Sequence, residues 1–533
     1  MLEEAVSEQF DLIVIGGGVT GAGIALDASL RGIKTLLLEK EDFASGTSSK
    51  STKLIHGGLR YLKQFEIGLV RESGLERSVA HKNIPHLVHP ENMLLPIVKG
   101  GTFGKLSASL AISVYDFLAA VPREDKKKSL NKNQTIASEP LLKKERLKAG
   151  IIYSEYRTDD ARLTIELIKA AYRSGAQIFN YMLVEDFVYD SQNKIIGVKA
   201  KDISSEQNFS FNATQVVSAA GPWVDELREI NLSKKGKRLH LTKGVHIVVP
   251  FDKLPIKSSI YFDSNDGRML FAIPRNKTTY IGTSDTNYTG NKNEVKCTQE
   301  DVSYILSNVN NMFSIPPLTL ADVSSSWAGL RPLIHEDGKS PSELSRSDEI
   351  FISESNLISI AGGKLTGYRK MAKRIVDLLQ KRNANFSQIE CKTKNYKIHL
   401  NSFADYQDYL QFKNALASKF ELNIEQTKEL EYLCSCYGKS AEQIINQALN
   451  TKNDFARSLI KAEINHVLKY ESAIHPLDYI IRRSGKLFFD IDAVQKHLSF
   501  IIQEFGNYYS WNTGQVQNAT LECESAIVDA TIS

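Results

Sequence analysis

Two short stretches of the chain combine residue types that can do chemistry. The segment Ser49–Leu62, SKSTKLIHGGLRYL, places a histidine, two glycines, an arginine and a tyrosine after a run of small polar residues. Histidine titrates near neutral pH and can take a proton from a reacting group, whereas arginine donates two parallel hydrogen bonds to an anion. The second stretch, IVIGGGVTGAG, contains Gly16, Gly18 and Gly21 in a G-x-G-x-x-G spacing, which is typical of a dinucleotide-binding turn.

The elements around these glycines are those of a βαβ unit. An apolar run over Leu12–Ile15 predicts a buried strand, a helix is expected over about Val19–Arg31, and a second strand over Leu36–Leu38. The first glycine allows a tight turn, the second lets the backbone approach a pyrophosphate, and the third allows close packing of helix on strand. Glu39 ends the second strand, 18 residues after Gly21, where a carboxylate accepts both ribose hydroxyls and repels a 2′-phosphate. The unit therefore predicts a dinucleotide cofactor and disfavours NADP.

The order of segments along the chain favours FAD over NAD. Residues 151–287 contain short alternating segments with turns, such as NKIIGVKA, which indicate antiparallel strands. The segment Asn356–Leu379 then returns to a strand, a glycine turn and a helix. We expect an α/β fold with a discontinuous Rossmann-like FAD-binding domain within residues 1–390, and an inserted antiparallel-sheet substrate domain mainly within about 80–345. Residues 391–533, with only four glycines and one proline, predict a mostly helical C-terminal domain.

Composition sets broad limits on function. The chain has 533 residues, of which 42% are hydrophobic and 24% charged, as in an ordinary globular protein. A net charge of +4 argues weakly for an anionic ligand and does not indicate a nucleic-acid binder. Five scattered cysteines indicate a reducing compartment, and the C-x-C of Cys434 and Cys436 lacks the second pair of a zinc site. We expect no signal peptide, metal site or transmembrane span.

Several motifs together resemble one family. The segments IVIGGGVTGAGIALDASLRG and TSSKSTKLIHGGLRYL are similar to the FAD-dependent, aerobic-type glycerol-3-phosphate dehydrogenases of the D-amino-acid-oxidase-like flavoprotein superfamily. The likeness continues in VSAAGPWVDEL, LTKGVHIVVP, SSSWAGLRPL, AGGKLTGYRKMA and PLDYIIRRSGKLFF, and covers roughly residues 10–500. The resemblance implies oxidation of sn-glycerol 3-phosphate to dihydroxyacetone phosphate, with FAD as cofactor and a quinone as electron acceptor. Some members of the family use oxygen instead, and no motif in this sequence separates the two acceptors.

The resemblance also implies roles for particular residues. His56 and His246 are the acid–base candidates, although the apolar strand after His246 leaves a buried core histidine as the alternative. Arg331 is expected to bind substrate and to stabilise a developing alkoxide. Because a dianionic phosphate needs several cations once it leaves water, the further implied substrate ligands are Arg60, Tyr61, Arg346 and Lys364. The implied cofactor contacts are Gly16, Gly18, Gly21, Glu39, Thr47, Ser48, Ser49, Gly57, Val184, Gly221, Gly363, Leu365 and Thr366.

Two other interpretations of the whole chain stay open. A related flavin oxidase of a small amine or 2-hydroxy acid, using oxygen, would need cations for a carboxylate but no cluster for a phosphate. A nucleotide-binding interaction module without catalysis is disfavoured by the cationic residues spread over separate motifs. At a smaller scale, Asp159 or Asp160 in EYRTDDARLT is expected to cap the helix that follows.

One apolar stripe bears on the location of the protein. Its members fall on one face of an expected helix and are Phe103, Leu106, Leu110, Val114, Phe117 and Val121. Lysines and an arginine flank the stripe, so it suits either a helix that faces the core or one that lies in a membrane interface. By resemblance we expect a cytoplasmic protein, peripheral on the cytoplasmic face of the membrane, and a homodimer is an open expectation.

Overall fold

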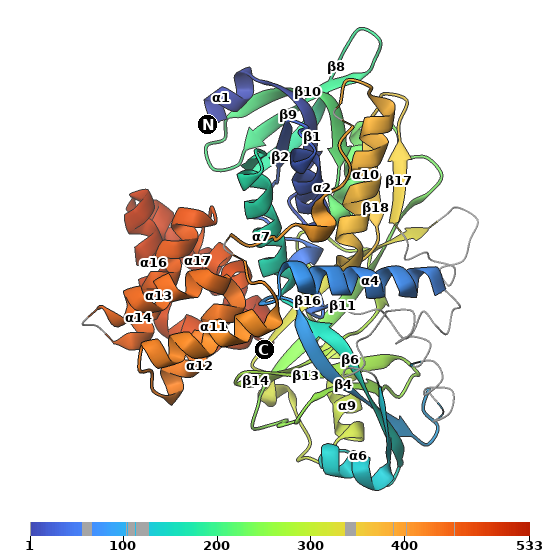
Figure 1. The fold of residues 1–533 in the computed structure, drawn as a ribbon, viewed down its shortest axis with the longest axis vertical. Coiled ribbons are helices and arrows are strands. Elements are labelled where there is room, and N and C mark those ends of the chain that lie inside the picture. Colours follow the sequence, from blue (N-terminus) through green and yellow to red (C-terminus); the bar gives the residue numbers. More distant parts are fainter. Residues whose placement is uncertain are drawn as a thin grey trace.

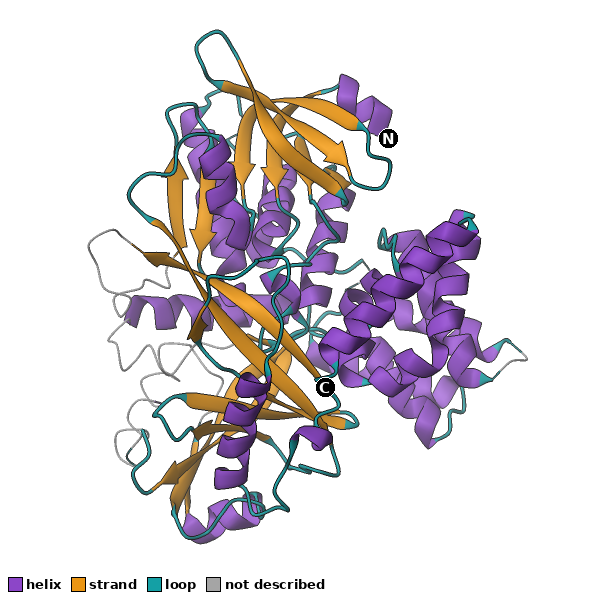
Figure 2. Ribbon diagram, turned by 180° about the vertical axis from the view of Figure 1, so that it is seen from behind, coloured by secondary structure: helices purple, strands orange, loops and turns teal. Residues whose placement is uncertain are grey.

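The computed structural model contains two β-sheets and a separate helical body. It describes residues 2–55, 67–102, 104, 112, 127–335, 348–386, 388–400, 402–451 and 454–532. In Figure 1 the sheet that contains the N-terminal strand lies at the top, the second sheet lies below it, and the helical body stands to one side. Figure 2 shows the strands confined to the two-sheet body.

The upper sheet has a parallel centre built from the N-terminal βαβ unit. Strand β1 pairs in parallel with β2 and β10, and β10 pairs in parallel with β18. The sheet has the order β17-β18-β10-β1-β2-β7, and β8 and β9 extend it antiparallel from β10. The strands are β1 (Gln9–Ile15), β2 (Thr35–Leu38), β7 (Gln177–Phe179), β8 (Met182–Tyr189), β9 (Ile195–Asp202), β10 (Asn208–Ser218), β17 (Asp348–Ile352) and β18 (Ile358–Gly362).

Helix α2 (Val19–Leu30) is the centre of the helical layer on this sheet. It packs against α7 (Asp160–Arg173) and α10 (Tyr368–Arg382), and it is buried along nearly its whole length. A helix that is apolar on all sides is expected where neighbours cover every face. The predicted βαβ unit is therefore confirmed, with boundaries within three residues of those expected from the sequence.

The lower sheet is mostly antiparallel and has ten strands among the described residues. Its order is β15-β11-β14-β13-β12-β4-β6-β3, with β16 on β11 and β5 on β6. The strands are β3 (Leu54–Ile55), β4 (His89–Val98), β5 (Lys128–Asn131), β6 (Leu147–Arg157), β11 (Arg238–Pro250), β12 (Ser259–Asp263), β13 (Met269–Arg275), β14 (Thr278–Gly282), β15 (Thr286–Asn287) and β16 (Ser325–His335). The insertion expected over about 80–345 is interrupted, because residues 177–218 return to the upper sheet as β7 to β10.

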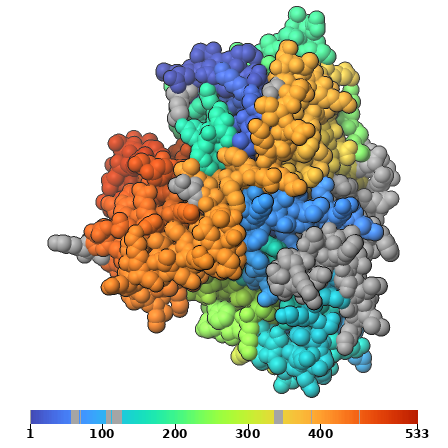
Figure 3. Space-filling view, viewed as in Figure 1, coloured from blue at the N-terminus to red at the C-terminus, as the bar shows by residue number. Residues whose placement is uncertain are grey.

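The C-terminal part is helical, as its composition predicts. Its helices are α11 (Tyr406–Lys419), α12 (Ile424–Tyr437), α13 (Ala441–Leu449), α14 (Phe455–Tyr470), α15 (Lys486–Phe489), α16 (Ile491–Tyr509) and α17 (Thr513–Ala530), and Asp478–Arg483 forms a π-helical turn. The space-filling view shows this domain against the two-sheet body along one side (Figure 3). Within the described residues, the remaining α-helices are α1 (Leu2–Ser7), α4 (Ile67–Asn83), α6 (Lys132–Ser138), α8 (Val224–Ile230) and α9 (Gln299–Met312).

The described helices and cysteines bear on the expectations about membranes and metals. Within the described ranges, no helix has both the length and the apolar character needed to cross a bilayer. The members of the apolar stripe between Phe103 and Val121 lie outside the described residues. The five cysteines are all free thiols, and the described residues contain no cluster of ligands suited to a metal ion.

Candidate active site

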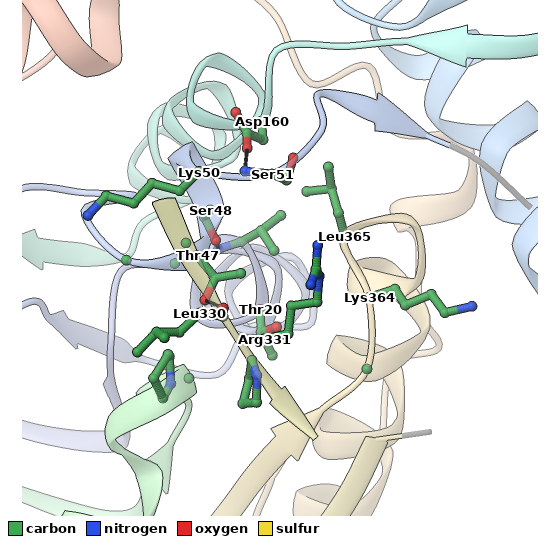
Figure 4. A pocket seen from close by; sticks show the side chains of 18 of the residues that line it. Thr20, Thr47, Ser48, Lys50, Ser51, Asp160, Leu330, Arg331, Lys364 and Leu365 are labelled. Atoms are coloured by element: carbon green, nitrogen blue, oxygen red, sulfur yellow. Dashed lines mark hydrogen bonds between the residues drawn. The ribbon is translucent and has the colours of Figure 1, made fainter. Parts of the chain in front are cut away.

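A cavity of about 850 Å³ opens where the carboxyl ends of the parallel strands face the lower sheet. Ligands of open α/β sheets bind at this edge, because the loops there leave a crevice. The upper sheet contributes the loops after β1, β2, β10 and β18, and the lower sheet contributes β11 and β16. Figure 4 shows the wall formed by Thr47 and Ser48 facing the segment that contains Lys364 and Leu365.

The glycine turn after β1 leaves no room for side chains. Gly16 has φ +112°, and an added Cβ would lie 2.7 Å from the carbonyl oxygen of Ala219. At Gly21 an added Cβ would lie 1.9 Å from the carbonyl oxygen of Gly16. The N-cap residue of α2, Gly18, has no side chain to cap the helix, so amide groups of its first turn other than that of Val19, which donates to Ser48, are left for an anion in the cavity. These features fit a pyrophosphate.

Glu39 lies at the end of β2 and lines the cavity. Its carboxylate is buried, and it accepts hydrogen bonds from the backbone amides of Gly17 at 2.6 Å and Glu41 at 2.9 Å. Burial raises the pKa of Glu39 to about 7, against the opposing effect of the two amides. Val184, on β8, also lines the cavity, and its contact with adenosine stays a prediction.

The loop Ser45–Lys53 forms the wall between the two sheets. Thr47 donates from its hydroxyl to the carbonyl oxygen of Leu330 at 2.7 Å, and Ser48 accepts from the backbone amide of Val19 at 3.0 Å. Both side chains lie at the cavity, whereas the buried Ser49 hydroxyl bonds within the loop to the carbonyl oxygen of Gly46 at 3.5 Å. The loop therefore joins the start of α2 to the strand β16.

His246 lies on β11, is buried, and faces the cavity. Its Nε2 is 3.0 Å from the hydroxyl oxygen of Thr52, and its ring stacks on Trp327 with centroids 4.8 Å apart and planes 11° apart. Its Nδ1 has no hydrogen-bond partner in the part of the chain that the structure describes. Burial, followed by the positive charges of Arg331 and Lys53, holds the pKa of His246 well below its usual value. The imidazole is therefore neutral and retains a lone pair that can accept a proton.

Arg331 lies on β16 and projects into the cavity close to His246. Its guanidinium donates to the hydroxyl of Thr283 at 2.8 Å, and to the carbonyl oxygen of Ser284 and the carboxylate of Asp285 at 3.1 Å each. These three bonds fix the plane of the guanidinium while leaving it at the cavity wall. A fixed, permanently charged group of this kind suits an anionic ligand.

The loop between β18 and α10 forms the opposite wall. Gly362 and Gly363 both have φ +76°, which turns the chain sharply before α10. The three residues that follow are Lys364, Leu365 and Thr366, and all line the cavity, as does Gly221 from the loop after β10. The structure therefore places the glycine-containing loops after β10 and β18 at the cavity.

Several cavity residues were not expected from the sequence. Lys50 and Arg268 line the wall as additional cations, and burial lowers the pKa of Lys50. Asp160 also lines the cavity and forms a 2.6 Å ion pair with Lys53. Asp159 caps α7 by accepting from the backbone amide of Arg162 at 3.1 Å, which confirms the expected cap. In the sequence, Lys50 and Thr52 are marked only by their place in the polar run at the start of the segment Ser49–Leu62.

Five expected site residues lie outside the described residues. They are His56, Gly57, Arg60, Tyr61 and Arg346. Their assignment to the site therefore stays a prediction from the resemblance.

The fold and this cavity define an FAD-dependent oxidoreductase. Residues 11–367 match the family model described as FAD dependent oxidoreductase, and residues 391–516 match the model described as the C-terminal domain of alpha-glycerophosphate oxidase. FAD is therefore the cofactor. The cavity-lining residues that could hold it are the glycine turn, Glu39, the Thr47–Ser48 segment and the loop after β18.

Individual relatives narrow the family further. The chain is 45% identical to a Staphylococcus haemolyticus protein and 46% identical to a Staphylococcus aureus protein, each named aerobic glycerol-3-phosphate dehydrogenase, over 98% of this chain and 95% of each relative. The solved glycerol-3-phosphate dehydrogenase from Bacillus halodurans, complexed with FAD, is 42% identical with a TM-score of 0.84 and covers 99% of this chain and 96% of that one. The chain belongs to the aerobic glycerol-3-phosphate dehydrogenase family.

Proposed function

We propose that the protein oxidises sn-glycerol 3-phosphate at its secondary hydroxyl to dihydroxyacetone phosphate. The observation that carries the proposal is a buried His246 beside Arg331, with its pKa held well below the usual value, in the cavity that also contains the dinucleotide cradle. Bound FAD supplies the acceptor for the hydride that leaves the substrate carbon. The names of the relatives support glycerol 3-phosphate as the substrate.

In this proposal His246 acts as the general base. Oxidation of a secondary alcohol forms a C=O bond, so the carbon loses a hydride and the oxygen loses its proton. A ring nitrogen of His246 takes this proton, because the neutral imidazole has a free lone pair. The hydroxyl of Thr52 and the stacked ring of Trp327 hold the imidazole in one orientation. Entry of a dianionic substrate raises the proton affinity of the base.

Cations at the cavity wall bind the phosphate and the reacting oxygen. Arg331 lies near His246, which suits a guanidinium that stabilises negative charge on the substrate oxygen. By the resemblance, Lys364 joins Arg331 in binding the phosphate. Lys364 belongs to the opposite cavity wall, and in this structure its side chain extends away from Arg331 (Figure 4). Arg60, Tyr61 and Arg346 complete the proposed substrate ligands.

In the same proposal, the electrons taken from the substrate pass to a quinone in the membrane. The protein contacts the cytoplasmic face of that membrane. The resemblance to quinone-linked dehydrogenases supports this acceptor, and the word aerobic in the names of the relatives fits a respiratory chain. A membrane contact and a homodimer belong to the same proposal.

An anaerobic titration tests the proposal. Glycerol 3-phosphate is expected to bleach the flavin absorbance of the purified protein, while glycerol at the same concentration does not, because Arg331 and the other cations recognise the phosphate. Reoxidation is then followed with a water-soluble quinone and with oxygen in separate experiments. Equal bleaching by glycerol would contradict the phosphate site, and faster reoxidation by oxygen than by the quinone would contradict the acceptor.

A further inference from the structure

The C-terminal helical domain contacts the strand that carries the catalytic arginine. The hydroxyl of Ser325, the first residue of β16, donates to the carbonyl oxygen of Phe488 at 2.5 Å. The neighbouring Ser326 donates to the carbonyl oxygen of Ala530, at the end of α17, at 3.2 Å. Both bonds are buried, so the helical domain fixes the start of β16 at two points.

Aromatic rings continue this contact into the active site. Phe488 and Phe489, at the end of α15, lie 5.3 Å and 5.6 Å from the ring of Trp327 between centroids. Trp327 in turn stacks on His246, and Phe489 also meets Tyr280 edge to face at 5.6 Å. A continuous row of packed rings therefore joins the helical domain to the proposed base.

The same rings hold the loop that bonds to His246. Trp327 donates from its indole nitrogen to the carbonyl oxygen of Ser51 at 3.3 Å, and Tyr280 donates from its hydroxyl to the carbonyl oxygen of Thr52 at 3.1 Å. Thr52 is the residue whose hydroxyl lies 3.0 Å from Nε2 of His246. A displacement of Trp327 therefore affects His246 both through the stacked ring and through this loop.

We propose that Phe488 and Phe489 are positioning residues for His246, so that the helical domain completes the active site. This inference rests on the proposed function, in which His246 is the base. Neither phenylalanine lines the cavity, so their effect passes through Trp327. The domain also holds the cofactor side, since Arg482 and Arg483 both donate to the buried carboxylate of Asp42, three residues after Glu39.

Loss of either ring has a defined consequence for the base. A smaller side chain leaves space behind Trp327, because a packed core relaxes only partly around a deletion. The imidazole then loses its fixed plane and gains access to water, and its pKa rises, since burial is the main cause that lowers it. The charged groups that face His246 are Arg331 from β16 and Lys53 from the loop, the latter paired with Asp160. Arg275, over the ring of Phe489, is paired with Asp159.

The test uses the holoenzyme with Phe488→Leu and Phe489→Leu, alone and together. The control is Phe505→Leu, which removes a ring buried in α16, where the helix packs on α14 and α17. We expect each test variant to retain FAD, to have an unchanged KM, and to have a kcat about tenfold lower. In a plot of kcat/KM against pH, the acidic limb is expected to move to higher pH by about one unit. Hydrogen exchange of the peptide 325–331 is expected to quicken in the test variants and to stay unchanged in the control.

Two results would overturn the inference. One is an unchanged acidic limb with unchanged exchange of peptide 325–331 in both test variants, and the other is an equal pH shift in Phe505→Leu. Where a leucine variant fails to retain FAD, Phe489→Met removes the ring while keeping most of its volume, and the same expectations apply. Failure of the proposed function can be told apart from failure of this inference. If the proposed function is wrong, the parent protein does not oxidise glycerol 3-phosphate, whereas hydrogen exchange of the peptide 325–331 still reports on the packing of Trp327.

Discussion

Glu39 links the affinity for FAD to pH. Its pKa is about 7 in the ligand-free protein because the carboxylate is buried, and ribose hydroxyls that donate to it favour the ionised form. FAD binding therefore releases a proton, so the affinity is expected to rise up to about tenfold per pH unit below pH 7 and to level off above it. Quenching of flavin fluorescence by apoprotein between pH 5.5 and 8.5 measures this.

The variant Glu39→Gln is the matched comparison, because glutamine keeps the shape and loses the titration. Its affinity is expected to be weaker at pH 8 and flat across the range. The same group destabilises the folded apoprotein as pH rises, since its stabilising contribution is complete below about pH 4.5 and is lost as pH passes about 7. A parent protein whose FAD affinity falls between pH 6 and 8 would contradict this account.

Thr52 offers a second test at the level of one atom. Thr52→Val keeps the shape and removes the oxygen that lies 3.0 Å from Nε2 of His246, whereas Thr52→Ser keeps it. Loss of one hydrogen bond that orients the base is expected to lower kcat up to about tenfold with little change in KM, in line with about 0.5–1.5 kcal/mol. Steady-state kinetics of both variants at pH 7.5 measure it, and equal losses in Val and Ser would show that the oxygen has no such role.

Residues near the glycine turn could be predicted from the sequence, whereas the neighbours of His246 could not. Gly16, Gly21 and Glu39 lie within one βαβ unit, so the geometry of that unit fixes their positions from spacing alone. The stacking of Trp327 on His246 depends on the pairing of β11 with β16, which are 81 positions apart at these residues. Because the two strands are far apart in the chain and no short turn joins them, their local sequences do not show that Trp327 lies beside His246.

The turn between β1 and α2 is an element on which cofactor binding is expected to depend. At Gly21 an added methyl group would lie 1.9 Å from the carbonyl oxygen of Gly16, so α2 must move away from β1. Gly21→Ala is expected to cost about 1–3 kcal/mol of overpacking strain, which corresponds to about 5- to 150-fold in FAD affinity. The ratio of flavin to protein absorbance and a titration of apoprotein measure this.

Gly68→Ala is the control for that element. Gly68 lies in α4, where an added Cβ meets no atom of the described residues within 4 Å, so its replacement is expected to leave FAD binding unchanged. Equal FAD affinities in the two variants would contradict the close packing of α2 on β1.

The sheets also show where prediction from sequence ends at the scale of elements. Alternating segments between 151 and 287 predict antiparallel strands, and most of them are. The sequence does not reveal that β10 leaves this series and pairs in parallel with β1, because β10 is joined to β9 by a short hairpin-like turn. Parallel pairing between distant strands is decided by the crossover connections, and these span both sheets here.

At the scale of the whole molecule, buried ion pairs join the helical domain to the FAD-binding domain. Arg162, on α7, donates to both carboxylate oxygens of Glu471 at 2.6 and 2.9 Å and to Glu166 at 3.2 Å. Lys169 donates to Glu471 at 2.9 Å. Arg162, Glu166 and Glu471 are almost inaccessible to water, so each charge depends on the others. The two domains are therefore expected to unfold together.

Glu471→Gln tests this coupling. Glutamine keeps the shape but leaves Arg162 and Lys169 with less negative charge, and removal of one partner from a buried pair costs about 3–5 kcal/mol. Burial alone would raise the pKa of Glu471, but Arg162 and Lys169 outweigh it and hold the pKa well below its usual value. The contribution is therefore complete above about pH 4.5 and is lost as pH falls further. Thermal denaturation of the holoenzyme at pH 7.5 is expected to occur at a clearly lower temperature in the variant.

The exposed pair of Lys419 and Glu442 provides the control, since both side chains lie at the surface of the helical domain. Glu442→Gln is expected to change stability by less than about 1 kcal/mol, because water screens an exposed pair. If domain coupling depends on the buried pairs, Glu471→Gln also separates the single transition into two, with FAD released in one of them. Equal denaturation temperatures for the two variants would mean that packing around α15 and β16, rather than these charges, holds the domains together.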